Sequence, residues 1–139
     1  MAKEFTELVA WQRADALELF MRTVLKRPAI IGDVQFCRQA ADSAASGPRN
    51  IAEGFGRFGP VQFAQYLRIA IGSEQETKNQ VIKAWQRGII NDEEREAGLL
   101  LAKRAVTSAT SLRRYLLTSQ ARANARNIED RTMNPWAIY

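Results

Sequence analysis

The sequence contains no histidine, and Cys37 is its only cysteine. Without histidine the chain cannot form a Ser-His-Asp or Cys-His nucleophile pair, a His-ligated zinc site or a carboxylate–histidine di-iron site. The hydroxyl groups of Tyr66, Tyr115 and Ser73 likewise have no histidine to activate them. A single cysteine cannot form an internal disulfide. We therefore expect a protein that is not an enzyme and that uses no metal or other cofactor.

Long apolar runs are also missing. Purely apolar stretches such as Leu99–Ala102 are far short of the roughly 20 residues that span a bilayer. The first five residues, Met1–Phe5, do not begin the apolar segment of a signal peptide. We expect a cytoplasmic protein with no membrane partner.

The chain has 139 residues, with 20 Lys and Arg against 15 Asp and Glu, which leaves a net charge of +5. This length favours one domain, and such a chain can bury roughly two thirds of the surface that its unfolded form exposes. A single core without disulfides is therefore feasible. Arginine outnumbers lysine by 15 to 5, which suits bidentate contact with phosphates or carboxylates. The alternative is that these arginines form surface ion pairs.

Apolar residues recur at helical spacing through most of the chain, and no segment alternates as a half-buried strand does. The pattern predicts helices over about 6–26, 33–54, 60–87 and 91–119. Expected N-caps are Thr6, Asp33 and Asn91, while Pro60 suits a first helical position. Proline has no amide hydrogen, so Pro48 predicts a kink or a restart within 33–54.

Four helices joined by short connections indicate an all-α, antiparallel up-and-down four-helix bundle over residues 1–119. Residues 120–139 are a basic C-terminal tail, which we expect to be partly ordered or to extend the fourth helix. Aromatic residues such as Trp11, Phe58, Trp136 and Tyr139 are in surplus, and apolar surface of this kind often marks an interface. Burial within the subunit is the competing explanation for Trp11.

Positive charge is concentrated toward the C-terminus. Residues 97–139 carry seven basic and two acidic groups, whereas residues 1–96 carry thirteen of each. At about 100° per residue, five basic side chains share one arc of the fourth helix and its extension, opposite an apolar stripe from Ala102 to Leu117. This arc suits a phosphate backbone, and we expect nucleic-acid contacts from Lys103, Arg104, Arg114, Arg122 and Arg126. The alternative is a solvated face against acidic neighbours.

Two charged residues occupy positions where the helical pattern predicts apolar ones. Glu74 lies within the stripe of the third helix, and Arg113 lies near the apolar arc of the fourth. Because a charge in a core must be paired or lose its ionisation, we expect Glu74 to pair with Arg113 or Arg38. The alternative is that these positions face a subunit interface.

Gly54, Gly56 and Gly59 match the GxGxxG pattern of dinucleotide-binding loops, but that pattern requires a preceding strand. Here a helix is expected instead, so we expect no dinucleotide-binding fold. The glycines leave Arg57 beside the N-terminus of the next helix, whose free N–H groups favour an anion. We therefore expect a second anion site at Arg57, with a plain turn as the alternative.

Three ion pairs at i, i+4 spacing are expected along the second helix: Arg38–Asp42, Arg49–Glu53 and Glu53–Arg57. Exposed pairs of this kind contribute only a few tenths of a kcal/mol each. They are either ordinary surface pairs or part of a partner surface.

The order of residues resembles a known family. Leu8-x-x-Trp11-Gln12, Arg38-x-Ala40-x-x-Ser43 and above all Asn50-Ile-Ala-Glu-Gly-Phe-Gly-Arg57 are similar to four-helix bundle proteins encoded in intervening sequences of bacterial large-subunit ribosomal RNA genes. The match continues through Phe63, Leu67, Ile69-Ala70, Gly72-Ser73, Glu76, Gln80 and Ala84, and covers roughly residues 5–118. The chain differs from the family pattern at Glu74, Thr77, Lys78 and Asn79, where family members tend to have Leu, Leu, Glu and Thr.

The resemblance implies a four-helix bundle that assembles into a ring-like or barrel-like homopentamer, and a ribosomal-protein label. A relative, the accessory variability protein (Avd) of diversity-generating retroelements, binds nucleic acid and a reverse transcriptase. Five copies would multiply the charge of +5 to +25, which would attract RNA or DNA more strongly than one copy.

We therefore expect a homo-oligomeric accessory protein that binds nucleic acid, assisting a reverse transcriptase or an rRNA-linked element. The alternative is an oligomeric scaffold that docks a protein partner and has no nucleic-acid role. Structural or interface roles are expected for Arg38, Asn50, Glu53, Gly54, Gly56, Glu74, Glu76 and Arg113.

Overall fold

The structure is a computed structural model that describes residues 3–57, 59–118, 121 and 123. Four long helices dominate this part of the chain, which contains no strand: α1 (Val9–Leu25), α3 (Val34–Phe55), α4 (Pro60–Gln86) and α5 (Asp92–Leu116). Two short elements accompany them, the 3-10 turn η1 (Phe5–Glu7) and α2 (Pro28–Ile31). The prediction of an all-helical chain is confirmed.

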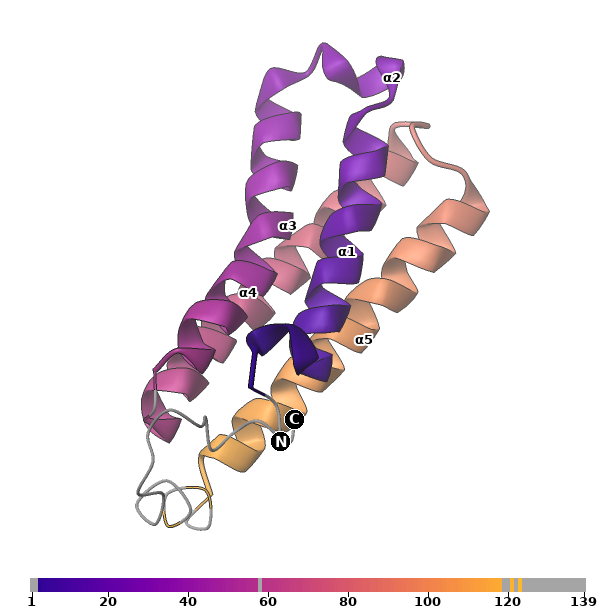
Figure 1. The fold of residues 1–139 in the computed structure, drawn as a ribbon. Coiled ribbons are helices and arrows are strands. Elements are labelled where there is room, and N and C mark those ends of the chain that lie inside the picture. The colour runs from indigo at the N-terminus through magenta and orange to yellow at the C-terminus, as the bar shows by residue number, and fades with distance from the viewer. Residues whose placement is uncertain (1–2, 58, 119–120, 122, 124–139) are drawn as a thin grey trace.

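The long helices form a bundle. α1 packs against α3 and α5, and α4 packs against the same two helices, so α1 and α4 lie across the diagonal. Successive long helices run in opposite directions, and α2 lies at the same end of the bundle as the α4–α5 connection (Figure 1). The α1–α3 face and the α4–α5 face are therefore on opposite sides of the molecule. Among the described helices, none is long and apolar enough to cross a bilayer.

Helix ends follow the expected capping chemistry at three sites. The Asp33 side chain accepts a hydrogen bond from the Phe36 amide at 3.0 Å, and Asn91 accepts one from the Glu94 amide at 2.8 Å. Glu94 returns a bond to the Asn91 amide, which completes a capping box. Pro60 begins α4 at its first position, and Gly88, just past the end of α4, has a φ of 73°.

The N-terminal boundary differs from the expectation. Thr6 is not the N-cap of the first long helix, because it lies in η1 and α1 begins at Val9, after an extended Leu8. α1 ends at Leu25, and Pro28 begins the short helix α2, which the sequence pattern did not indicate. Pro28 suits that position because its missing amide hydrogen would be unpaired there in any case.

Pro48 does not cause the second predicted helix to restart. α3 is one helix from Val34 to Phe55 with Pro48 inside it. Tertiary packing holds this segment, since Gly47 is buried between Ala14 of α1 and Glu74 of α4, and Pro48 is also buried. α5 ends at Leu116, and the predicted end at 119 lies outside the described residues.

The core has two apolar ends and a polar middle. One cluster, around Leu8, Phe63 and Leu112, lies at the η1 end of the bundle, and another, around Met21, Ile30 and Val81, lies at the α2 end. Between them α1 and α5 form a small apolar cluster, while the α3–α4 contact is polar. Its buried members are Ser43, Ser46, Glu74, Thr77 and Gln80.

Two glycines allow helices to approach closely. A Cβ atom on Gly54 of α3 would lie 2.6 Å from the Phe63 ring and 2.8 Å from Cβ of Tyr66, both on α4. A Cβ atom on Gly98 of α5 would lie 2.8 Å from both Phe20 and Val81. Gly54 is thus a buried residue of a helix interface and not part of a loop.

Candidate nucleic-acid interface

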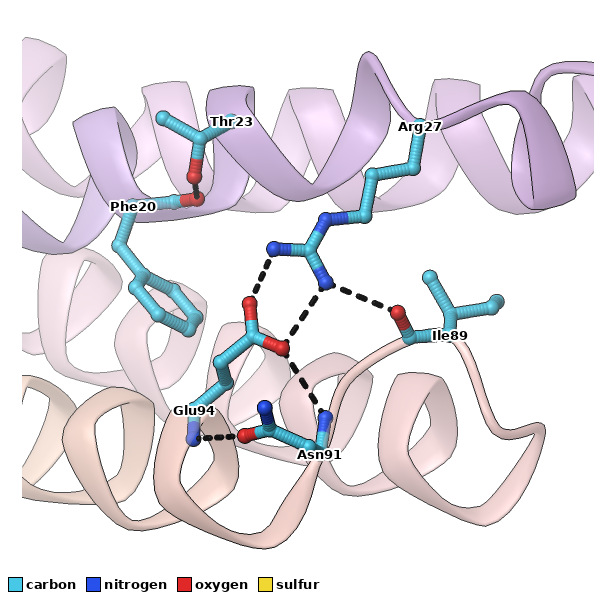
Figure 2. Close-up of polar contacts among 6 residues, drawn as sticks. All are labelled: Phe20, Thr23, Arg27, Ile89, Asn91 and Glu94. Atoms are coloured by element: carbon cyan, nitrogen blue, oxygen red, sulfur yellow. Dashed lines mark hydrogen bonds and ion pairs between the residues drawn. The ribbon is translucent and has the colours of Figure 1, made fainter.

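At the α2 end of the bundle, three arginines contact acidic partners. Arg27, between α1 and α2, makes a bidentate ion pair with Glu94, and its Nη1 also donates to the backbone carbonyl of Ile89 at 2.9 Å (Figure 2). The hydrogen bond from Arg27 lowers the pKa of the Glu94 carboxyl below its usual range. This network joins the α1–α2 turn to the start of α5. The positive charge of Arg27 is neutralised by Glu94 within the molecule.

Two further arginines at this end are also engaged. Arg87 pairs with Asp33 at 2.6 Å and lies over the Phe36 ring. The Phe36 amide and Arg87 together lower the pKa of Asp33. Arg95 lies 4.2 Å from the centre of the Trp85 ring and pairs with Glu96. None of these arginines is positioned to bind an external anion without losing a partner.

The outward face of α5 is different. Lys103, Arg104 and Arg114 are exposed, and none of their side chains has an ion-pair or hydrogen-bond partner among the described residues. The opposite face of the helix is buried through Ala102, Ala105, Ala109, Leu112 and Leu116. Every acidic residue of α5 lies before Ala97, so the rest of the helix presents only positive charge. We call these three side chains the α5 basic face.

The predicted pattern of the fourth helix differs from the structure at Leu117, and two of its basic residues lie outside the described side chains. Leu117, expected in the apolar stripe, follows the end of the helix and is 40% exposed. Arg122 and Arg126, the other two predicted phosphate contacts, lie outside the described side chains.

Arg57, the predicted second anion site, is already engaged. Its Nη2 donates to Glu53 Oε1 at 3.1 Å, and its guanidinium group lies 5.5 Å from the centre of the Tyr66 ring. Tyr66 also donates to Glu53 Oε1, at 3.2 Å. Glu53 and Tyr66 raise the pKa of Arg57 further. The predicted Glu53–Arg57 pair is confirmed, and it ties the end of α3 to α4.

The Asn50–Arg57 motif serves helix packing. The Asn50 side chain donates to the carbonyl oxygen of Ser46 at 2.8 Å and to its hydroxyl group at 3.0 Å. The Ser46 hydroxyl group lies 2.7 Å from that of Ser73 on α4. Gly54 provides the close approach, and Gly56 caps α3. These residues join α3 to α4 near the η1 end.

The predicted pairing of Glu74 is wrong. The residue is 1% exposed, and neither carboxylate oxygen has a hydrogen-bond partner. Arg38 is exposed on α3, and Arg113, whose Nε is buried without a partner, forms no ion pair with Glu74. Burial raises the pKa of Glu74 to about 8. The carboxyl group therefore avoids its desolvation cost by remaining protonated at neutral pH.

Two of the predicted surface ion pairs also fail to form. Arg38 does not pair with Asp42, and Arg49 approaches Asp42 at 4.0 Å instead of pairing with Glu53. Both members of the Arg49–Asp42 pair are exposed, so it contributes little. Glu76 is exposed on the outer side of α4.

Two grooves lie on opposite faces of the bundle. The α4–α5 groove, of about 300 Å³, is lined by Gln75, Lys78, Leu99, Ala102, Lys103, Val106 and Thr107. The α1–α3 groove, of about 310 Å³, is lined by Phe5, Trp11, Asp15, Glu18, Ala45, Pro48, Arg49 and Ala52. Lys78 of the first groove was not expected to join the basic face. Only the antiparallel pairing of α4 with α5 places it opposite Lys103.

Trp11 packs within the subunit. Its ring meets Phe5 edge to face, with the ring centres 5.5 Å apart, and it covers the apolar cluster at the η1 end. Trp11 is therefore partly buried within the subunit, and the rest of its ring lines the α1–α3 groove. Phe58, Trp136 and Tyr139 lie outside the described part of the chain. Over that described part, no group of three or more potential metal ligands is present.

Most of the sequence matches a protein-family model. The family model described as 23S rRNA-intervening sequence protein matches residues 6–111, well over half of the chain. The chain belongs to this family. No curated protein matches it. The family match spans η1 through most of α5 and so includes the Asn50–Arg57 motif, Lys103 and Arg104. Arg114, the third member of the α5 basic face, follows the matched region.

Proposed function

We propose that this member of the 23S rRNA-intervening sequence protein family is a non-enzymatic accessory protein that binds the phosphate backbone of nucleic acid through α5. The observation that carries the proposal is that the three unpaired side chains of the α5 basic face share one helix surface on which no acidic residue lies. Lys103, Arg104 and Arg114 are exposed on a helix surface without acidic residues. In contrast, the arginines at the α2 end are held by carboxylates.

Charge arrangement also supports contacts with the backbone and not with base edges. The α5 basic face is a broad helix surface. Contacts with phosphate groups position a protein on a nucleic acid without distinguishing its base sequence. Binding of this kind releases counterions, so affinity falls steeply as salt rises. The link to ribosomal RNA in the family's description supports RNA as the first ligand to test.

A homo-oligomer is part of this proposal, and the family resemblance suggests that it is a pentamer. Val61 and Ile69 lie 44% and 49% exposed on the outer side of α4, and the nearby Gly72 has open space around its Cα. Exposed apolar side chains on a helix surface suit packing against another copy. Assembly would repeat the basic face and raise its local potential. A reverse transcriptase is the protein partner that the resemblance to Avd suggests.

The α1–α3 groove favours a second candidate function, an oligomeric scaffold that docks a protein partner. Phe5, Trp11 and Pro48 give this groove an apolar surface, and its charged side chains are Asp15, Arg49 and Glu18, the last of which pairs with Arg22. A protein segment with a mainly apolar surface would fit there.

Binding to labelled RNA and DNA at two salt concentrations separates the two functions. We expect binding at about 50 mM salt that weakens by a factor of ten or more at about 200 mM. Sedimentation of the same samples reports the assembly state. Absent or salt-insensitive binding with an intact oligomer would overturn the nucleic-acid function and leave the scaffold.

A further inference from the structure

The α4–α5 groove brings together two lysines from different helices. Lys78 comes from α4 and Lys103 from α5, and both line the same depression of about 300 Å³. Gln75 and Thr107 add groups that can form hydrogen bonds, and no acidic side chain lines the groove. Neither lysine has an ion-pair partner within the described chain. The groove therefore presents two unneutralised cations to a ligand.

The rest of the groove includes an apolar surface. Leu99 and Val106 are half-buried, and Ala102 is fully buried beneath them. A ligand that fills this groove must therefore combine an anionic group with an apolar surface. A free inorganic anion would use only the lysines, and a fully apolar ligand would leave them unpaired.

We propose that the α4–α5 groove binds one unpaired nucleotide of a single-stranded nucleic acid. The phosphate group lies between Lys78 and Lys103, and the base lies on Leu99 and Val106. A volume of about 300 Å³ is at the lower end of small-molecule sites, which limits the occupant to about one nucleotide. In a duplex the base faces are stacked on one another, whereas a single strand can place them on protein side chains.

This inference rests on the proposed function and adds a strand preference to it. Lys103 belongs both to the α5 basic face and to the groove, so a strand that follows the face can place one nucleotide in the groove. The basic face alone would bind single strands and duplexes according to their charge density. The groove favours the single strand.

The test compares a fluorescently labelled 20-nucleotide single-stranded RNA with the matched duplex, by anisotropy titration of the full chain. The informative variant is Lys78→Gln. The control is Lys83→Gln, because Lys83 is an exposed lysine of the same helix that does not line the groove. We expect Lys78→Gln to weaken single-strand binding about tenfold, and both variants to weaken duplex binding about twofold.

A second variant tests the apolar floor. Val106→Thr keeps the branched shape of the side chain and replaces one methyl group with a hydroxyl group. The fold should therefore be retained. We expect it to reduce the preference for the single strand with little effect on duplex binding. Thermal unfolding of each variant reports whether the bundle is intact.

Three outcomes would overturn the inference. If wild-type chain binds RNA but Lys78→Gln and Lys83→Gln behave alike, the groove does not hold a nucleotide, and the proposed function stands without it. If wild-type chain binds neither ligand, the proposed function fails as well. If Lys78→Gln dissociates the oligomer and leaves RNA binding unchanged, the groove is an interface between copies.

Discussion

Cγ of Glu74 on α4 packs against Gly47 on α3, where a Cβ atom would lie only 3.4 Å away. The absence of a side chain at Gly47 makes room for a carboxyl group in the middle of the bundle. Ala14 of α1 closes the same site from the other side. The hydroxyl groups of Ser43, Ser46 and Thr77 are buried in the same α3–α4 layer, yet neither oxygen of Glu74 is hydrogen-bonded.

The first prediction is a fall in stability as the pH rises. Burial raises the pKa of Glu74 from its usual 4.5 to about 8. Below pH 4.5 the group is protonated in both states. Between these values the unfolded chain ionises and the folded chain does not, so the free energy of unfolding falls, by roughly 3 kcal/mol at pH 7. Urea unfolding between pH 5 and pH 9 measures this change.

Asp33 and Glu94 act in the opposite direction, because hydrogen bonds lower their pKa values. Their contribution to stability is fully present above the pKa that each group has in the unfolded chain. It is lost as the pH falls through the pKa in the folded chain. The effect of Glu74 is therefore best resolved above about pH 5. A flat profile from pH 5 to pH 9 would contradict the assignment of a protonated buried carboxyl group.

The second prediction concerns replacement of this group. We expect Glu74→Leu to raise stability at pH 8 and to remove the pH dependence, since an apolar side chain needs no hydrogen-bond partner. Glu74→Gln should also remove the pH dependence but gain less, because its amide remains unsatisfied. Unfolding curves at pH 5 and pH 8 distinguish the two. A less stable Glu74→Leu variant would show that Glu74 has a partner in the assembled protein.

The helices could be predicted from the sequence because the residues that begin and end a helix act on their immediate neighbours. The side chains of Asp33 and Asn91, and Pro60 at a first helical position, each act within one helical turn, so spacing alone identifies them. Thr6 satisfied the same rule, but extended Leu8 follows it and α1 begins later. Pro48 was expected to kink the helix or to make it restart; α3 does not restart there, and Gly47 packs against Glu74 and Ala14.

The pairing of charged residues was less predictable because it depends on rotamers and on helix register. Arg27 and Glu94 are 67 residues apart, and nothing in the local sequence links them. Lys78 was missed for the same reason, since only the packing of α4 on α5 brings it to Lys103. Helical periodicity did place Glu74 in the core, but it could not show that no arginine reaches it.

The third prediction compares two glycines of the bundle. Gly54→Ala places a methyl group 2.6 Å from the Phe63 ring, so we expect a loss of about 1–3 kcal/mol of stability. Gly72, also in a helix, has nothing within 4 Å of the same atom. Gly72→Ala should therefore stabilise the chain by about 0.5–1 kcal/mol. Equal effects of the two changes on urea unfolding would refute the close approach of α3 and α4.

The fourth prediction concerns the Arg27–Glu94 pair, which joins the α1–α2 turn to α5 (Figure 2). We expect Arg27→Met and Glu94→Gln each to lower the Tm by a few degrees. The double variant should lose less than the two single losses combined, because each single change leaves an unpaired group. Arg49 and Asp42, 4.0 Å apart and both exposed, form a control pair that should show no coupling. If the losses from Arg27→Met and Glu94→Gln are additive, the two side chains do not stabilise the fold through their interaction.

The central claim is that the α5 basic face binds the nucleic-acid backbone. Its most direct test is the salt dependence of RNA affinity for a triple variant with Lys103→Gln, Arg104→Gln and Arg114→Gln. The control triple variant changes three other exposed, unpaired basic residues to glutamine: Arg13, Lys26 and Lys83. Both variants lose the same charge, so only the position of that charge differs.

We expect the slope of log affinity against log salt to become shallower by about 2 for the α5 variant, because each phosphate contact contributes about 0.7 to 0.9. The control variant should keep a slope close to that of the wild-type chain. Equal slopes for the two variants would contradict the account, since binding would then follow net charge and not the exposed face of α5.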